Sequence, residues 1–311
     1  MKKIISYLKD YFFIELKPLY LLSIMLFIGT YIFAEYYWGL TDNINLSTFT
    51  KPSYIVAVIL HFFFPFSLAW LIYSFYYNDW KIWQNNRFWF LIIFASTVFS
   101  LRTFLSFFTY DIYRILPDGR TEYFLYRCVA VVFRDFFIIF PVFVYWWFAD
   151  RKTMPLYGFT LKNYNTKPYL IMLAIMLPLV VLASYQSDFL SQYPKGFSLF
   201  PLSFDVVTER KYFFIYEFFY GIDFIFIEFF FRGFLLLAFY RLFGWGCLLP
   251  MACFYVTIHF GKPLGETISS FFGGTILGIL AIRTGSIAGG IIVHLGIAWL
   301  MEFAALLHKM I

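Results

Sequence analysis

Four ionisable side chains lie within one apolar stretch, residues 212–243, and they are the first candidates for chemistry in this sequence. They are Glu217, Asp223, Glu228 and Arg232. A charge inside an apolar helix costs about 2.5–3.5 kcal/mol on insertion scales, so each one requires a partner or a hydrated cavity. Glu228 and Arg232 are separated by one helical turn and share a helix face. We therefore expect these two side chains to form an ion pair.

Two histidines follow in later apolar stretches. His259 ends the run Phe-Tyr-Val-Thr-Ile-His, and His294 lies within the last apolar run of the chain. Imidazole and carboxylate groups beside an arginine are typical of general acid–base chemistry, so we expect Glu228 and both histidines to line one polar cavity. The same three side chains resemble a two-histidine, one-carboxylate metal site. Because no H-E-x-x-H spacing is present, the prediction includes no metal and no cofactor.

The elements that hold these side chains are predicted to be membrane-spanning helices. Of 311 residues, 62% are apolar and 14% are charged, against about 45–50% and about 25% in soluble proteins. Apolar stretches of about 20 residues, the length that crosses a bilayer as a helix, recur along the chain. We predict an all-α polytopic bundle of about eight or nine helices. The predicted helices cover residues 18–39, 53–77, 87–109, 127–149, 167–188, 212–243, 245–260, 266–282 and 286–307.

The distribution of polar residues predicts two regions and a membrane partner. Intramembrane polar residues and glycines concentrate after residue 210, so we divide the chain into N-terminal transmembrane helices, 1–211, and a core, 212–311. The net charge of +6 fits contact with anionic membrane lipids, and no nucleic-acid groove is indicated. The three cysteines, Cys128, Cys247 and Cys253, lack metal-binding or redox spacing, so we expect packing roles.

Three short motifs in the core resemble those of the CPBP intramembrane protease family, also called the Abi family, which includes CAAX prenyl endopeptidases. The family motif Glu-Glu-x-x-x-Arg corresponds to Ile227 through Arg232, and Phe-x-x-x-His corresponds to Tyr255 through His259. The motif His-x-x-x-Asn corresponds to His294 through Ala298. Ile227 therefore stands where the first glutamate belongs, and Ala298 stands where the asparagine belongs. The resemblance covers roughly residues 212–307.

The resemblance implies an intramembrane endopeptidase that uses neither a bound metal nor a covalent intermediate. In the family's scheme, the first glutamate and the second-motif histidine activate a water, and the third-motif histidine and asparagine stabilise the oxyanion. Those roles fall here on Glu228, His259 and His294, with Arg232 retained. Because the first glutamate is replaced, either Glu228 or Asp223 is expected to supply the carboxylate, or the site is inactive.

Two further functions stay open beside the peptidase. A catalytically degenerate relative would bind a peptide or protein partner, as an immunity or scaffold protein does, and the replacements Ile227 and Ala298 favour that alternative. Intramembrane charges also occur in transporters, although no inverted repeat with paired broken helices is recognisable. The expected substrate is a peptide or membrane-associated protein, and the expected location is a prokaryotic plasma (inner) membrane.

Overall fold

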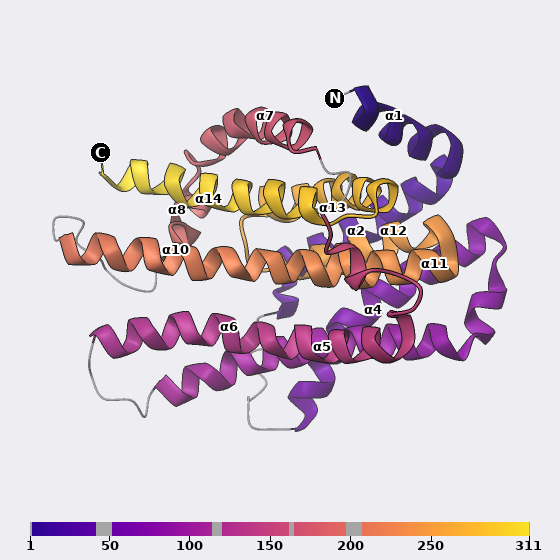
Figure 1. Ribbon diagram of the computed structural model, residues 1–311, viewed down its shortest axis with the longest axis horizontal. Helices are drawn as coiled ribbons and strands as arrows, with labels where there is room; N and C mark the ends of the chain where they lie inside the picture. Colours follow the sequence, from indigo (N-terminus) through magenta and orange to yellow (C-terminus); the bar gives the residue numbers. More distant parts are fainter. Residues whose placement is uncertain (1, 42–51, 114–119, 162–164, 197–206, 311) are drawn as a thin grey trace.

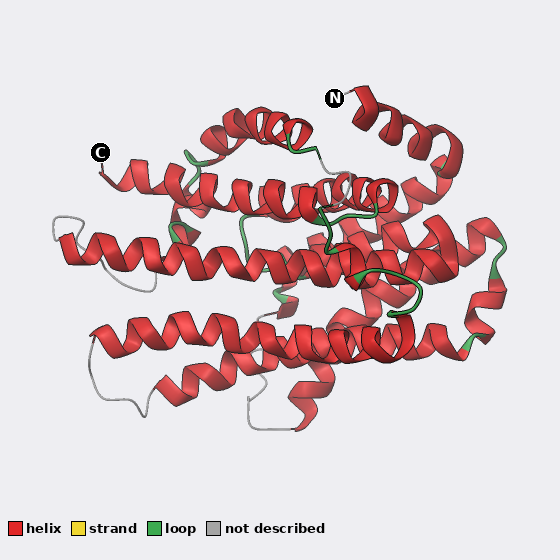
Figure 2. Cartoon of the chain, viewed as in Figure 1, coloured by secondary structure: helices red, strands yellow, loops and turns green. Residues whose placement is uncertain are grey.

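The chain folds into a bundle of helices. The structure is a computed structural model that describes residues 2–41, 52–113, 120–161, 165–196 and 207–310 (Figure 1). Helices account for almost all of these residues, and no strand occurs among them (Figure 2). The predicted all-α fold is confirmed.

Among the residues that the structure describes, seven α-helices precede the region in which the candidate residues lie. They are α1 (Lys2–Asp10), α2 (Pro18–Trp38), α4 (Pro52–Tyr77), α5 (Asn86–Tyr113), α6 (Arg120–Tyr145), α7 (Lys167–Ala183) and α8 (Ser187–Gln192). Short π or 3₁₀ turns join several of them, at Tyr11–Glu15, Trp80–Gln84, Trp146–Asp150 and Leu156–Gly158. α1 and α8 were not among the predicted helices, because both are short and α1 is polar. The predicted helix 167–188 ends in the structure at Ala183.

The stretch predicted as one regular helix, 212–243, has three consecutive parts. They are α10 (Val207–Glu228), the π-helix η5 (Phe229–Ala238) and α11 (Phe239–Phe243). A π-helix bonds each amide to the carbonyl five residues earlier, which changes the angular spacing of side chains from that of an α-helix. The change begins directly after Glu228. The periodicity used to place residues on helix faces therefore holds up to Glu228 and is altered beyond it.

The last third continues through η6 (Gly244–Cys247), α12 (Leu248–Thr257), α13 (Leu264–Thr284) and α14 (Ala288–Met310). α12 has 10 residues, all of them buried. At a rise of about 1.5 Å per residue, a helix of that length reaches only about half of the hydrocarbon thickness. The run 245–260 is therefore an inner helix packed on all sides and does not cross the bilayer as one span.

Within the described residues, six helices are long and apolar enough to cross a membrane. They lie at Pro18–Trp38, Tyr54–Tyr77, Asn86–Leu105, Tyr126–Asp150, Leu264–Thr284 and Ala288–His308. A shorter apolar helix spans Lys167–Ala183. The protein is a polytopic integral membrane protein.

Aromatic side chains form the centre of the bundle and join its two sequence regions. The ring of Phe62 on α4 lies 5.3 Å from that of Phe254 on α12, and the ring of Phe99 on α5 lies 5.2 Å from that of Phe230 on η5. All four side chains are buried. Cys128, Cys247 and Cys253 are buried free thiols, in agreement with the packing roles expected for them.

A tight loop at Leu156–Gly158 braces two of the helices that carry the candidate residues. The Gly158 carbonyl accepts a hydrogen bond from the Ile287 amide, 3.0 Å away, immediately before α14. The Tyr157 carbonyl oxygen would lie 2.8 Å from a Cβ added at Gly233, so only glycine fits at that position of η5. The loop thereby fixes the start of α14 and the middle of η5 at a common point.

Candidate active site

Glu228 and His294 meet at the interface between α10 and α14. His294 Nδ1 lies 2.8 Å from Glu228 Oε1, and the Glu228 side chain is completely buried. Because an ionised carboxylate can only accept, Nδ1 carries the proton in this hydrogen bond. The two residues are far apart in sequence, and the packing of the two helices brings them together.

Arg232 is the second partner of Glu228. Its Nη1 atom lies 3.0 Å from Glu228 Oε1, and the guanidinium carbon lies 4.0 Å from the centre of the Tyr255 ring. The expected one-turn ion pair is therefore present. The buried guanidinium is stabilised on one side by the carboxylate and on the other by the aromatic face.

His259 lies in the turn that follows α12 and is buried. Its Nδ1 atom is 2.9 Å from the Tyr255 carbonyl oxygen, one helical turn earlier. A carbonyl can only accept, so this contact places the proton on Nδ1 and leaves the Nε2 lone pair free to take a proton. The Tyr255 ring separates the two imidazoles, with ring centres 4.7 Å from His259 and 5.9 Å from His294.

The Glu228 carboxylate fits against α14 because residue 290 is a glycine. A Cβ built on Gly290 would lie 2.3 Å from Glu228 Oε2, well inside van der Waals contact. Gly290 precedes His294 by one helical turn and faces the same neighbour. A glycine at this position is therefore a geometric requirement of the Glu228–His294 contact.

Asp223 lies elsewhere, in a network of four charged side chains between α5, α6 and α10. It forms ion pairs with Arg102 and, at 3.1 Å, with Arg134. Arg102 also pairs with the buried Asp135, at 3.4 Å. The structure thus gives Asp223 two arginine partners on α5 and α6, while Glu228 has Arg232 and His294.

The two positions that depart from the family motifs are apolar and buried. Ile227 belongs to the large hydrophobic cluster that also contains Phe230 and Phe254. Ala298 is buried on α14, one turn after His294. Neither side chain has a polar atom to offer to a reacting group.

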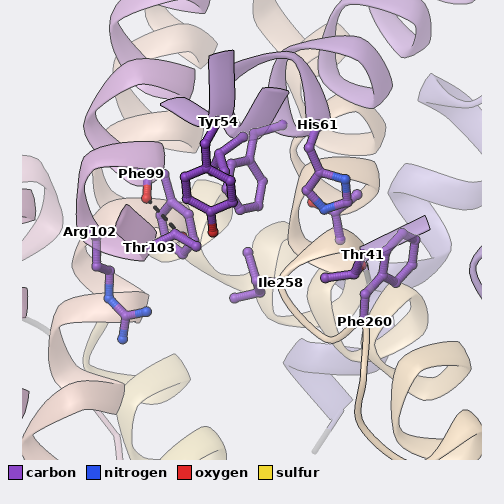
Figure 3. Close-up of a pocket in the computed structure, with 11 residues that line it drawn as sticks. Thr41, Tyr54, His61, Phe99, Arg102, Thr103, Ile258 and Phe260 are labelled. Carbon is purple, nitrogen blue, oxygen red and sulfur yellow. Dashed lines mark hydrogen bonds between the residues drawn. The ribbon is translucent and has the colours of Figure 1, made fainter. Parts of the chain in front are cut away.

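A pocket of about 220 Å³ lies beside the turn that carries His259 (Figure 3). Thr257, Ile258 and Phe260 form one wall, and residues of α4 and α5, among them His61 and Arg102, form the others. The walls of this pocket do not include Glu228, His259 or His294. The pocket is therefore adjacent to the candidate site but is not the common cavity expected from the sequence.

Charged groups surround the turn that carries His259. Lys262 Nζ lies 2.7 Å from Glu266 Oε1, and the Tyr193 hydroxyl donates to Glu266 Oε2 at 2.7 Å. Burial, reinforced by the nearby positive charge of Lys262, lowers the pKa of Lys195 to about 8. Among the described residues, no group of three or more histidine, cysteine or acidic side chains is arranged to hold a metal ion.

Residues 210–300 match the family model described as Type II CAAX prenyl endopeptidase Rce1-like. This part of the chain is similar to the CAAX prenyl endopeptidases of the CPBP family. The Rce1-like region begins at the start of α10 and ends within α14, so it contains all three motifs. The match supports a CAAX protease-type membrane peptidase. No curated protein and no solved structure matches the chain.

Sequence reasoning missed two residues of this site. The role of Gly290 follows from its distance to a carboxylate on another helix, and its only sequence signal is a small residue one turn before His294. Tyr255 was placed in the second motif, but its contacts to both histidines were not anticipated. Its sequence signal is the hydroxyl that tyrosine adds where the family motif has phenylalanine.

Proposed function

We propose that the protein is an intramembrane endopeptidase of the CPBP type that hydrolyses a peptide or membrane-associated protein through water activated by a carboxylate and a histidine. The observation that carries the proposal is the buried contact between Glu228 and His294, 2.8 Å apart on two helices of the Rce1-like region. A buried ionisable pair of this kind is costly in a membrane, and such residues usually serve a function.

Each of the four retained residues has a proposed role. Glu228 and His259 take the proton of the attacking water, and His259 has a free Nε2 lone pair for this step. His294 holds Glu228 in position for this step through its Nδ1 proton, 2.8 Å from Glu228 Oε1. Arg232 orients Glu228 by pairing with it at 3.0 Å. For Asp223 we propose a structural role, because Arg102 and Arg134 neutralise its charge.

The proposal extends to location and organisation. We place the protein in a prokaryotic plasma (inner) membrane, in contact with anionic lipids, as the net charge of +6 favours. The core, 212–311, carries the chemistry, and the helices of 1–211 enclose it. No metal or cofactor is needed, since carboxylate and imidazole groups suffice to activate water.

A second candidate is a degenerate relative that binds a peptide or protein partner without cleaving it. The apolar, buried side chains of Ile227 and Ala298 favour it, because they remove a carboxylate and an amide from the motif positions. Loss of one oxyanion donor lowers a rate by about 10²–10³ and leaves turnover measurable. The peptidase is therefore compatible with Ala298, and Glu228 supplies the carboxylate that Ile227 lacks.

The decisive experiment measures cleavage by the full chain reconstituted in liposomes. The substrates are fluorogenic CAAX-type peptides, one farnesylated and one unmodified, so that the two arms show whether prenylation matters. We expect cleavage by the native protein and its loss in Glu228→Gln, because the amide keeps the shape of the carboxylate but cannot take a proton. EDTA should leave the native rate unchanged.

Three results would contradict the peptidase. Tight binding of both peptides without cleavage would establish the non-enzymatic alternative. Full activity in Glu228→Gln would remove Glu228 from the chemistry. Activity lost in EDTA and restored by zinc would establish a metal hydrolase built on Glu228, His259 and His294. Elution profile and melting temperature in detergent, compared with the native chain, show that Glu228→Gln is folded.

A further inference from the structure

Tyr255 contacts every retained residue of the candidate site except Glu228. Its hydroxyl lies 3.1 Å from His294 Nε2 and 3.5 Å from Nδ1. Its carbonyl accepts from His259, and its ring lies against the Arg232 guanidinium. The side chain is buried, and a Cβ added at Gly274 would lie 3.0 Å from its Cδ1 atom. The ring is therefore held in a fixed position by α13 and η5.

The hydrogen bonds around His294 select one arrangement of protons. Nδ1 donates to Glu228 Oε1 at 2.8 Å, so Nε2 of the neutral imidazole is an acceptor. The Tyr255 hydroxyl lies 3.1 Å from Nε2 and donates the hydrogen bond to it. The result is a series of hydrogen bonds in which the Glu228 carboxylate orients the His294 imidazole and the imidazole orients the Tyr255 phenol. The phenol lies at the end of this series of hydrogen bonds.

We infer that the Tyr255 hydroxyl is a catalytic hydrogen-bond donor to the oxyanion. This inference rests on the proposed peptidase function. When the carbonyl carbon of the substrate is attacked, rotation about the Cζ–O bond of Tyr255 turns the phenol proton from His294 Nε2 to the developing oxyanion. No proton is transferred and no covalent bond to the protein forms in this step. Tyr255 thereby supplies the donor that is missing at Ala298.

Two features of the chain support this assignment over a packing role. The second motif of the family has phenylalanine where this chain has Tyr255, so the ring alone satisfies the packing at that position. The third motif has asparagine where this chain has Ala298, so one donor is lost on α14 and one is gained on α12. The Tyr255 hydroxyl lies 3.1 Å from His294 Nε2, and Ala298 lies one turn after His294 on α14.

The test is Tyr255→Phe, which removes the hydroxyl and keeps the ring against Arg232 and Gly274. With the liposome assay and whichever CAAX-type peptide the native chain cleaves, kcat should fall about 10²-fold, the usual effect of one lost oxyanion donor, with KM within about twofold. Ala298→Asn added to Tyr255→Phe should recover at least about tenfold in kcat, because the amide replaces the donor. Tyr31→Phe is the matched control, since its hydroxyl contacts His61 outside the site at 3.3 Å; its kcat should be unchanged.

The outcomes separate the inference from the proposed function. Native kcat in Tyr255→Phe, with activity still lost in Glu228→Gln, would overturn the role of Tyr255 and leave the peptidase intact. A fall in kcat that Ala298→Asn does not relieve, or that accompanies a lower melting temperature, would assign Tyr255 to packing and overturn its catalytic role. Absence of cleavage by the native chain would overturn both the function and the inference.

Discussion

At Glu228, the position of a carboxylate depends on a residue without a side chain. Gly290 lies under Glu228 Oε2, and the contact leaves no room for a methyl group. The polar atoms of the site are thus held by packing against α14 as well as by hydrogen bonds. Small residues at helix interfaces commonly permit close approach of this kind.

We predict that Gly290→Ala lowers the rate of peptide cleavage about 10²-fold, because a displacement of about 1 Å at a reacting group has an effect of that size. The added methyl must push Glu228 away from His294. Gly273→Ala on α13 is the matched control, since a Cβ added there has no heavy atom within 4 Å. Both variants should be expressed at the native level. Equal rates in the two variants would show that Glu228 does not need its present position.

The sequence predicted the contact between site residues on one helix. It did not predict the distances between site residues on different helices. The Glu228–Arg232 pair follows from a separation of one helical turn, and the structure confirms it. The partner of His294 was named within a set of candidates, but the distance to Glu228 depends on how α10 and α14 pack. The contacts of Asp223 are the clearest example of what the sequence does not predict. Its partners, Arg102 and Arg134, come from helices about a hundred residues earlier, and no local pattern links them.

Among the elements, the π-helix η5 is the one that sequence patterns could not reveal. An apolar run such as 229–238 is compatible with α or π geometry, because every face of it is buried. Helical periodicity is informative only where one face is polar, and here hydrophobic packing surrounds the segment. The helix boundaries were predicted well in α2, α4 and α14, where turn or polar residues flank the apolar run.

The charge network between α5, α6 and α10 is expected to stabilise the packing of these helices. Asp223→Asn leaves Arg102 and Arg134 with Asp135 as their remaining acidic partner in the network. Breaking a buried ion pair by removing one partner costs about 3–5 kcal/mol, so we expect a lower melting temperature in detergent. Asp188→Asn on the exposed start of α8 is the control and should have little effect. A variant with the native melting temperature but without cleavage would place Asp223 in the chemistry instead.

Over the whole molecule, the two regions of the chain share one core. Rings of α4 and α5 pack against rings of η5 and α12, and the charge network joins α5 and α6 to α10. The fold class and the membrane location followed from composition, since 62% apolar residues cannot be buried in a soluble protein of this length. How the N-terminal helices contact the Rce1-like region depends on side chains from distant segments, which composition does not specify.

We therefore predict that residues 207–311, expressed without the preceding helices, accumulate far below the level of the full chain. Asp223 would enter the bilayer without Arg102 and Arg134, at a cost of about 2.5–3.5 kcal/mol on insertion scales. Co-expression of residues 1–206 should restore the level, and Asp223→Asn in the isolated fragment should restore part of it. Membrane fractionation and immunoblotting measure the amounts. A fragment that accumulates fully by itself would instead be an independent folding unit.

The burial of all three native thiols has a practical consequence for topology mapping. Cys128, Cys247 and Cys253 are shielded from aqueous reagents, so the native chain should react little with maleimides. A cysteine introduced at the exposed Lys81, between α4 and α5, or at the exposed Lys152, after α6, would then be the dominant reactive thiol. Labelling of intact cells with a membrane-impermeant maleimide would assign each of these two turns to one side of the membrane without removal of any native cysteine.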